Sequence, residues 1–416
     1  MNETQQNIKN RTLQTFSALK HRNFQLFWSG QFISLIGTWM QSVAQGWLVL
    51  QLTNSAFLLG LVNGIASLPV LLFSLPGGVV ADRMKKRNLL IFTQTVAMFL
   101  AFLLALLTYL HLKGRFDLKV WYVVAIAAVG GSVFALDAPA RQSFFIEMVG
   151  KKDLLNAIAL TSAIFNAARI VGPALAGVLI GVIGTAGCFF LNGLSFVAVI
   201  IGLYLIRVPH VPSKKTASAW QEMKQGLVYA WRHRQVRSLE GIVAVFSIFG
   251  MPYLVLMPIF ARDILNKGAG GLGFLMTATG VGALAGSLIL AAFSGSTKKG
   301  ALVFWSGIIF AATNIAFASS RSYPLSLAIL PLVGFSMVSQ VATINTILQS
   351  IVPDEMRGRV MGVHTMMFMG MMPFGSFIAG SIAQRWGAPF ALQLGAGICF
   401  IFTITIYKLV PDLWQM

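Results

Sequence analysis

The sequence predicts an all-α membrane protein with twelve transmembrane helices in two six-helix bundles related by pseudo-two-fold symmetry. Twelve long apolar stretches run through the chain, and the Lys and Arg residues of the loops between them fall mainly on alternate sides. Hydrophobic residues make up 56% of the chain and charged residues 10%, so a soluble protein of 416 residues could not bury its apolar side chains in one core. Lipid must therefore be the solvent for most of the surface.

Each apolar stretch is long enough to cross a membrane as a helix, which needs about 20 residues for roughly 30 Å of hydrocarbon. A polar, basic tail precedes the first stretch, which lacks a short apolar core ending in a small-residue cleavage site, so we expect no removable signal peptide. The predicted spans are 24–50, 57–80, 88–111, 119–140, 156–182, 187–206, 238–261, 270–293, 301–319, 324–348, 360–382 and 389–409.

The formal charge of +19 is a topology signal. With the N-terminus in the cytoplasm, 23 of the 31 basic residues fall on the cytoplasmic side, seven fall outside and Arg169 lies within a span. This bias predicts that both termini are cytoplasmic, and it excludes the nucleic-acid partner that such a charge would suggest in a soluble protein. Cys188 and Cys399 both lie in spans and predict no disulfide.

The longest connection divides the spans six and six. It is basic, and apolar residues recur in it at helical spacing, which favours an amphipathic helix on the inner membrane surface. This helix could tether the two halves or regulate them. The apolar positions are Trp220, Met223, Leu227 and Trp231.

A weak internal repeat supports two matched halves, because the 28 residues from Gly60 align with those from Gly273. Parallel six-span repeats are the plan of a large class of secondary transporters. We therefore expect an N-terminal bundle over 1–206, a cytoplasmic linker over 207–237 and a C-terminal bundle over 238–416.

The loop after the second span reads GGVVADRMKKR from Gly77 and resembles the signature of the major facilitator superfamily, although Lys85 stands where that pattern usually has glycine. Glycine allows close backbone approach, and one carboxylate among cations can cap a helix or pair across a closed gate. A plain positive-inside loop is the alternative. The expected cytoplasmic gate consists of Gly78, Asp82, Arg83, Lys86, Arg87, Asp137 and Arg141.

Two further stretches resemble one branch of that superfamily, the bacterial enterobactin exporters and macrolide efflux pumps. They are DAPARQSFFIEMVG from Asp137 and VPDEMRGRVMG from Val352, and the opening from His21 is similar as well. The resemblance implies the major facilitator fold, transport, and a bacterial inner membrane location. It does not imply the cargo, since members of the branch carry chemically different molecules.

The fifth span contains a motif similar to the Gly-Pro motif of superfamily exporters and antiporters. It consists of Gly172, Pro173 and Gly177, with Ala176 where glycine is frequent. Small residues let helices pack closely and proline removes a backbone hydrogen bond, so we expect a packed hinge face.

Arg169 is the only charged residue well inside a span, about 20 Å from its inner end by helix rise. A charge costs about 2.5 kcal/mol or more at the centre of a bilayer, which makes a role in transport the default hypothesis. Arg169 could face anionic cargo, or it could satisfy carbonyl groups freed by Pro173 or pair with Asn166. Both readings remain open.

No carboxylate is expected at mid-membrane, so the coupling ion has no obvious carrier. His364, in the eleventh span, can titrate near neutral pH and is a candidate for proton coupling, although a structural role is the alternative. Five neutral polar residues could line the substrate path together with Arg169 and Asn166: Gln41, Gln45, Asn63, Gln340 and Thr343.

The sequence contains no HExxH helix, no phosphate-binding loop and no metal-ligand cluster, so we expect neither an enzyme nor a metal or other cofactor. We predict a monomeric secondary active transporter that exports amphipathic or anionic small molecules of the siderophore or antibiotic class, by alternating access and coupled to protons. A lipid or lysophospholipid flippase is the alternative, and a membrane receptor or enzyme is a distant third.

Overall fold

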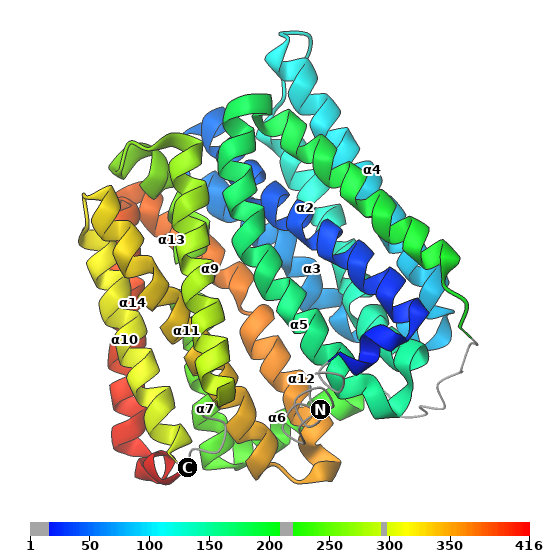
Figure 1. The fold of residues 1–416 in the computed structure, drawn as a ribbon. Helices are drawn as coiled ribbons and strands as arrows, with labels where there is room; N and C mark the ends of the chain where they lie inside the picture. The colour runs from blue at the N-terminus through cyan, green and yellow to red at the C-terminus, as the bar shows by residue number, and fades with distance from the viewer. Residues whose placement is uncertain (1–15, 209–218, 293–297) are drawn as a thin grey trace, which may run out of the picture.

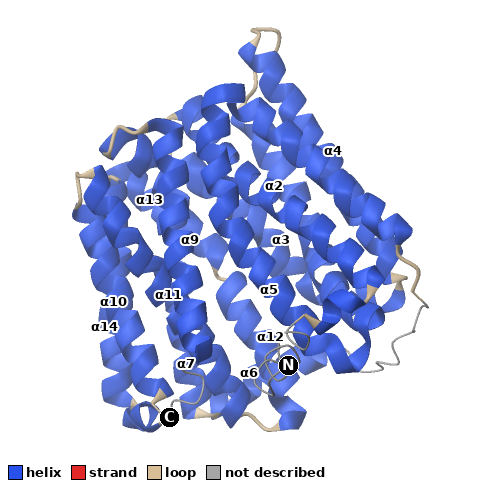
Figure 2. Ribbon diagram, viewed as in Figure 1, coloured by secondary structure: helices blue, strands red, loops and turns tan. Residues whose placement is uncertain are grey.

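The computed structural model describes residues 16–208, 219–292 and 298–416, without the side chains of residues 74–82, 219, 291 and 292. These residues form helices joined by short turns and loops (Figure 2). Most helices run between two ends of the molecule (Figure 1). We call the end with helix α6 and the C-terminus the α6 end, and the opposite end the far end.

The first part of the chain begins with a 3-10 turn and continues in four helical elements. The last of these, 86 residues long, is interrupted at Gly150 and Gly184, where the backbone φ angles are 70° and 71°. Only glycine adopts such angles without strain, so this stretch consists of three helices. The elements are η1 (Ser17–Lys20), α2 (Arg22–Thr53), α3 (Ala56–Arg83), α4 (Lys86–Leu112) and α5 (Val120–Leu205).

The second part of the chain has two interrupted spans. Two π-helical turns follow α7 in one of them, and the other breaks at Gly370 between α12 and α13. The elements are α6 (Ala219–Arg232), α7 (Arg234–Val245), η2 (Phe246–Gly250), α8 (Tyr253–Ile259), η3 (Phe260–Ile264), α9 (Gly268–Ala292), α10 (Lys299–Ser319), α11 (Tyr323–Ile351), α12 (Asp354–Met369), α13 (Met372–Trp386), α14 (Ala388–Leu409) and η4 (Pro411–Gln415).

The described helices agree with the twelve predicted spans. Nine helical segments are long and apolar enough to cross a membrane, and α5, which comprises three helices, counts as one of them. α2 adds a span of sufficient length whose apolar character is diluted by polar side chains such as Gln31 and Gln41. Every predicted span therefore falls on a helix, and the fold is that of a twelve-span membrane protein.

Glycine contacts bring helices of the two parts together near the far end. A Cβ atom on Gly60 of α3 would lie 2.3 Å from the carbonyl oxygen of Ser376 in α13. A Cβ atom on Gly273 of α9 would lie 2.5 Å from the carbonyl oxygen of Pro173 in α5. Both distances are shorter than van der Waals contact, so only glycine permits these two helix pairs to approach so closely.

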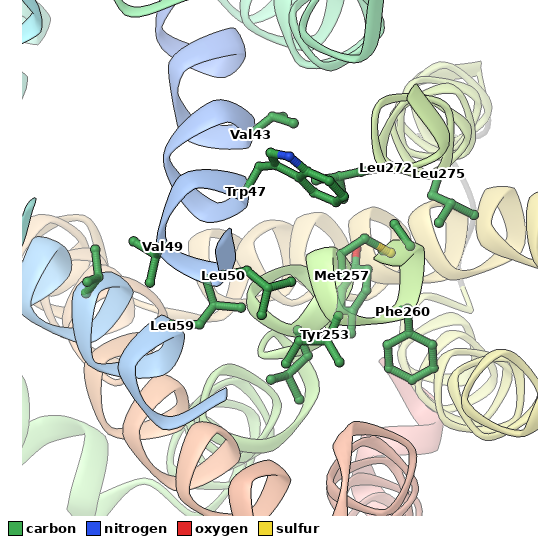
Figure 3. Packing of buried hydrophobic residues seen from close by; sticks show 14 of the residues in the cluster. Val43, Trp47, Val49, Leu50, Leu59, Tyr253, Met257, Phe260, Leu272 and Leu275 are labelled. Atoms are coloured by element: carbon green, nitrogen blue, oxygen red, sulfur yellow. The ribbon is translucent and has the colours of Figure 1, made fainter. Parts of the chain in front are cut away.

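A hydrophobic cluster fills the space between these helix pairs (Figure 3). Trp47 of α2 and Leu59 of α3 belong to it, as do Tyr253 of α8 and Leu275 of α9, and Tyr253 is fully buried. The two parts of the chain are thus joined at the far end by apolar packing as well as by close backbone contact.

Helix α6 forms where the sequence predicts an amphipathic helix. Its Met223 is buried, and a Cβ atom on Gly226 would lie 2.6 Å from the carbonyl oxygen of Arg359, so one face packs against α12. Trp220 and Trp231 project from α6 with exposed fractions of 71% and 72%. Exposed tryptophans are typical of a helix at a membrane interface, and its position on the inner surface stays a prediction.

Candidate functional site

A cavity of about 480 Å³ lies among α2, α3, α4 and α5. Its wall combines neutral polar side chains, one ion pair and apolar residues. From the second part of the chain, Met369 and Met372, on either side of the break between α12 and α13, contribute to it. The polar lining residues are Gln31, Ser34, Thr38, Gln41, Gln45, Asn63, Ser67, Gln94, Asp137, Arg141 and Asn192.

Three residues predicted for the substrate path line this cavity: Gln41, Gln45 and Asn63. The Nδ2 atom of Asn192 donates a hydrogen bond of 2.6 Å to Oε1 of Gln41, which links α5 to α2 beside the cavity. The amide of Asn63 donates to the carbonyl of Leu59 one turn earlier. The polar wall is therefore largely organised by bonds within the protein.

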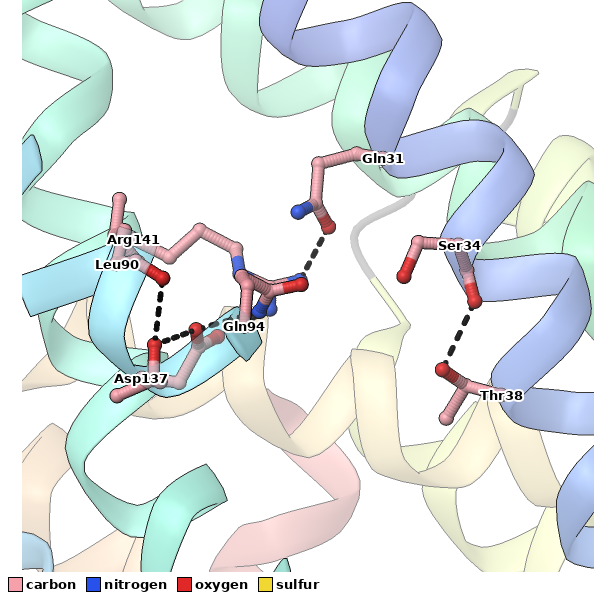
Figure 4. Close-up of polar contacts among 8 residues, drawn as sticks. Gln31, Ser34, Thr38, Leu90, Gln94, Asp137 and Arg141 are labelled. Carbon is pink, nitrogen blue, oxygen red and sulfur yellow. Dashed lines mark hydrogen bonds and ion pairs between the residues drawn. The ribbon is translucent and has the colours of Figure 1, made fainter. Parts of the chain in front are cut away.

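An ion pair between Asp137 and Arg141 occupies the wall nearer the α6 end (Figure 4). Asp137 is 2% exposed, and it accepts hydrogen bonds of 2.7 Å from Oγ1 of Thr93 and from Nε2 of Gln94. Arg141 donates from Nη1 to Oε1 of Gln31 at 2.5 Å. The carboxylate is thus satisfied by three donors, as a buried charge requires.

Two atoms of this network keep unused hydrogen-bonding capacity within the described part of the chain. They are Oε1 of Gln94, an acceptor, and Nε of Arg141, a donor. Both side chains line the cavity. Both atoms are buried behind the cavity surface, so they belong to the packing of the network, while the apolar residues of the wall suit an amphipathic molecule.

The other predicted gate residues do not form one cluster with this pair. Lys86 forms a buried ion pair of 2.5 Å with Glu147 of α5. Arg87 donates from Nε to the carbonyl of Leu203 at 2.7 Å and from Nη2 to that of Tyr204, near the C-terminal end of α5. Arg83 is exposed. The backbone of Gly78 is described but the side chain of Asp82 is not, so the part of these two residues in a gate stays a prediction.

Arg169 lies between the two parts of the chain and is not among the residues that line the cavity. Its guanidinium stands 5.9 Å from the centre of the Trp39 ring, and Nη2 lies 3.6 Å from Sδ of Met337. The hydroxyl of Tyr253 contacts the same sulfur at 3.5 Å. Asn166 donates to the carbonyl of Ser162, one turn earlier in α5. The aromatic ring of Trp39 and the polarizable sulfur of Met337 thus stabilise the guanidinium at this interface.

Gln340 and Thr343 are buried in α11 and do not line the cavity. A Cβ atom on Gly307 of α10 would lie 2.7 Å from Nε2 of Gln340, so this amide faces α10. Gln340 thus takes part in helix packing here, and a place for Gln340 and Thr343 in a substrate path stays a prediction.

The Gly-Pro motif of α5 packs against two helices. A Cβ atom on Gly172 would lie 2.5 Å from Cβ of Trp39 in α2, and Gly177 faces Gly270 and Gly273 of α9. Pro173 lies inside the helix between these contacts. The packed face expected from the motif is present, and its action as a hinge stays a prediction.

Glu240 pairs with His364, although no pattern in the sequence distinguishes this glutamate. Nδ1 of His364 lies 3.3 Å from Oε2 of Glu240, and both residues are buried. Glu240 lies three residues into a predicted span, and a linear reading places it at the membrane edge rather than in the interior. Glu240 and His364 are more than 100 residues apart in the chain, so the sequence does not indicate that they are in contact.

Polar contacts join the two parts of the chain at the far end. Arg262 of η3 donates to the carbonyl of Leu50 at 3.0 Å and to Oδ1 of Asn54 at 2.7 Å. Gln384 of α13 accepts hydrogen bonds from Oγ of Ser55 and from the backbone of Phe57. These bonds and the glycine contacts close the far end.

A model of the transmembrane secretion effector family matches residues 13–413, nearly the whole chain. The chain belongs to this family of transmembrane secretion effectors. The family is an efflux-type branch of the major facilitator superfamily, so the chain is a multi-pass membrane transporter and not an enzyme.

The alignments with three curated relatives cover most of both chains. The staphyloferrin A transporter of Staphylococcus aureus is 26% identical over 87% of this chain and 89% of its own. The multidrug efflux pump Tap of Mycolicibacterium fortuitum is 26% identical over 84% and 87%. Macrolide efflux protein A of Streptococcus pyogenes is 21% identical over 88% and 92%.

Solved structures show that the chain has the major facilitator fold. A bacterial homologue of the human lysosomal transporter Spinster, in an inward-facing and unoccupied conformation, has a TM-score of 0.72 at 13% identity and covers 95% of this chain and 98% of its own. A D-xylose-proton symporter has a TM-score of 0.70 at 13% identity and covers 96% and 98%.

Proposed function

We propose that the protein is a secondary active exporter of amphipathic or anionic small molecules of the siderophore or antibiotic class. The observation that carries the proposal is the cavity of about 480 Å³, with its polar wall, its buried Asp137–Arg141 pair and its methionines. Relatives named for transport of staphyloferrin A, of multiple drugs and of macrolides support this range of cargo.

Export would proceed by alternating access between bundles 1–206 and 238–416, joined by linker 207–237. The positive-inside bias assigns the α6 end and both termini to the cytoplasm of a bacterial inner membrane. With the far end closed by Arg262 and Gln384, the conformation described here would then be the one that accepts cargo from the cytoplasm. We propose that the transporter works as a monomer and exchanges cargo for protons.

Of the two cations considered for anionic cargo, Arg141 is better placed than Arg169. Arg141 lines the cavity with 21% of its side chain exposed, whereas Arg169 contacts Trp39 and Met337 at the interface between the two parts. The exposed part of a guanidinium can bind a carboxylate or a carbonyl oxygen.

A lipid flippase has weaker support. A second hollow, with a volume of about 880 Å³, is lined by apolar and aromatic residues of α4 and α5, with Lys113 at one edge. Both helices belong to the same part of the chain, so this hollow offers no lateral route between the two bundles. Lipid acyl chains around the helices would fill it in a membrane.

Purified protein in liposomes tests the function directly. We would screen siderophores, macrolides and fluorescent lipids, with and without an imposed pH gradient and without ATP. The proposal expects saturable transport of at least one soluble cargo, accelerated by the gradient. Movement of the fluorescent lipids alone would overturn it in favour of the flippase.

A further inference from the structure

Glu240 and His364 form a buried acid–base pair between α7 and α12. The exposed fractions of the two residues are 4% and 5%, and the Nδ1–Oε2 distance is 3.3 Å. From Arg234 and Asp354, the first residues of their helices, a rise of 1.5 Å per residue puts them about 9 Å and about 15 Å along each helix. The pair therefore lies below the surface of the α6 end, surrounded by an apolar cluster that includes Val236, Ile347 and Val360.

The pair has few other partners. Within the described residues, neither carboxylate oxygen of Glu240 nor Nδ1 of His364 has a hydrogen-bond partner of good geometry. Among the described residues, the other charged and titratable side chains on the helices packed against the pair are engaged elsewhere or exposed, apart from Glu222 and Tyr229, which lie half-buried on α6. Arg234 donates to the carbonyl of Leu409, Arg237 stacks on Trp231, Arg357 pairs with Asp354 and Arg359 contacts Met356. Tyr407 donates to the carbonyl of Gly300, and Cys399 contacts the carbonyl of Val245. The exposed residues are Arg83, Lys224, Arg232, His233, Glu355 and Lys408.

We propose that Glu240 and His364 together bind and release the coupling proton of the exporter. This inference deepens the proposed function and rests on it. With one proton between them the two groups carry no net charge, and the buried, apolar surroundings favour carboxylic acid and neutral imidazole over carboxylate and imidazolium. Loss of that proton leaves a net negative charge in an apolar cluster, which is stable only where water reaches the pair.

The proton site lies close to the cargo cavity along α12. His364 precedes Met369 by five residues, about 7.5 Å along the helix, and Met369 lines the cavity. The helix breaks there, and the hydroxyl of Ser247 in the π-helical turn η2 donates to the carbonyl of Phe368. Two irregular segments thus face each other between the pair and the cargo, and such segments are frequent at functional sites.

The exchange is balanced with one proton in each cycle. When the cavity faces outward, the unprotonated pair takes a proton from the outer solution and becomes neutral. When the cavity faces the cytoplasm, the pair gives the same proton to water, and cargo enters beside Met369. Because α13 continues beyond the break to the Gly60 contact at the far end, movement of α12 against α7 can be transmitted to that closure.

Infrared difference spectroscopy of the purified, cargo-free protein tests the proton site, between about pH 5 and pH 9, the range in which an imidazole normally titrates. We expect the wild type to show a carboxyl band that appears on acidification and is absent from Glu240→Gln. In His364→Gln the midpoint of this band should move by at least tenfold in proton concentration. Glu222→Gln, which removes a carboxylate from neighbouring α6, should leave both band and midpoint unchanged.

Two outcomes overturn the inference: no titrating band that depends on Glu240, or a band whose midpoint does not respond to His364→Gln. If Glu240→Gln does not fold, the midpoint of the carboxyl band in His364→Gln decides whether the two groups share a proton. Failure of the proposed function looks different, because a wild type that transports no soluble cargo could still show the coupled titration. Conversely, transport driven equally well by a pH gradient in Glu240→Gln would remove the proton site and leave export intact.

Discussion

At the scale of single residues, the structure gives two half-buried arginines of the first part of the chain different surroundings. Arg141 pairs with Asp137 beside the cavity, whereas Arg169 rests against the ring of Trp39 and the sulfur of Met337. A cation over an indole ring is stabilised by about 0.5–2 kcal/mol. Arg169 can therefore remain charged at this interface without cargo.

Arg169→Ala should lower the free energy of unfolding by about 1–2 kcal/mol, since it removes the contacts with Trp39 and Met337. Affinity for a transported cargo should stay within a factor of two. Arg169→Lys should also lose stability, because an ammonium lacks the planar face that stacks on the ring. Melting in detergent and cargo affinity, measured side by side, check this. A well-folded Arg169→Ala protein with cargo binding weakened more than tenfold would return Arg169 to the binding site.

Asp137→Asn should destabilise the protein strongly, because Arg141 would keep its charge without a carboxylate beside it. Breaking a buried pair in this way costs about 3–5 kcal/mol. Asp354→Asn is a matched control, since Asp354 pairs with Arg357 on the same helix but is 86% exposed. It should cost less than about 1 kcal/mol. Chemical unfolding in one detergent compares the two variants, and equal losses would contradict the assigned importance of burial.

The sequence identified polar residues in spans but not the direction in which they point. Gln41 and Gln340 were chosen by the same criterion, yet Gln41 lines the cavity and Gln340 faces Gly307. Rotation of a helix about its axis depends on its neighbours, and a neutral amide fits a cavity wall or a helix contact equally well. Gln94 and Asn192 were missed for the same reason. Charge patterns predict which loops share a side because the alternation of loops is a property of the linear chain, and the orientation in the membrane stays a prediction.

At the scale of elements, glycines determine how closely helices approach and where they break. The motif in α5 was recognisable because glycine and proline have distinct backbone effects, and the twelve spans followed from length and hydropathy. The breaks at Gly150, Gly184 and Gly370 fall among 40 glycines, most of which lie within regular helices. Which of these permits a contact depends on the helix opposite, and the sequence does not name that partner.

Gly273→Ala should push α9 away from α5, because the added Cβ would lie 2.5 Å from the carbonyl oxygen of Pro173. Overpacking costs about 1–3 kcal/mol, and here only the state closed at the far end bears it. We expect the population open at that end to rise at least fivefold. Spin labels at positions 113 and 385 would report the change as a longer distance.

Gly397→Ala is the control for this substitution, since a Cβ at Gly397 of α14 would meet no atom within 4 Å. It should leave the distance distribution unchanged and slightly favour the helix. A distribution in Gly273→Ala identical to that of the control would mean that the α5–α9 contact does not hold the far end closed.

At the scale of the whole molecule, closure of the far end by Arg262, Gln384 and the glycine contacts predicts two mutually exclusive states. Label pairs at 113 and 385 for the far end, and at 151 and 357 for the α6 end, should report distances that change in opposite directions. Lowering the pH or adding cargo should shift both together. Protein that transports cargo while both ends are held closed by crosslinks would contradict alternating access.

The polar groups around the cavity are unevenly shared between the two parts of the chain. Gln41, Asn63, Asp137 and Arg141 all precede residue 209, while the second part contributes Met369 and Met372. A cargo molecule would therefore form its hydrogen bonds with the first part of the chain and meet an apolar surface on the second. It could stay bonded to the first part while the second part moves past it. Substitutions that alter cargo recognition and substitutions that alter proton binding would then fall on different parts of the chain.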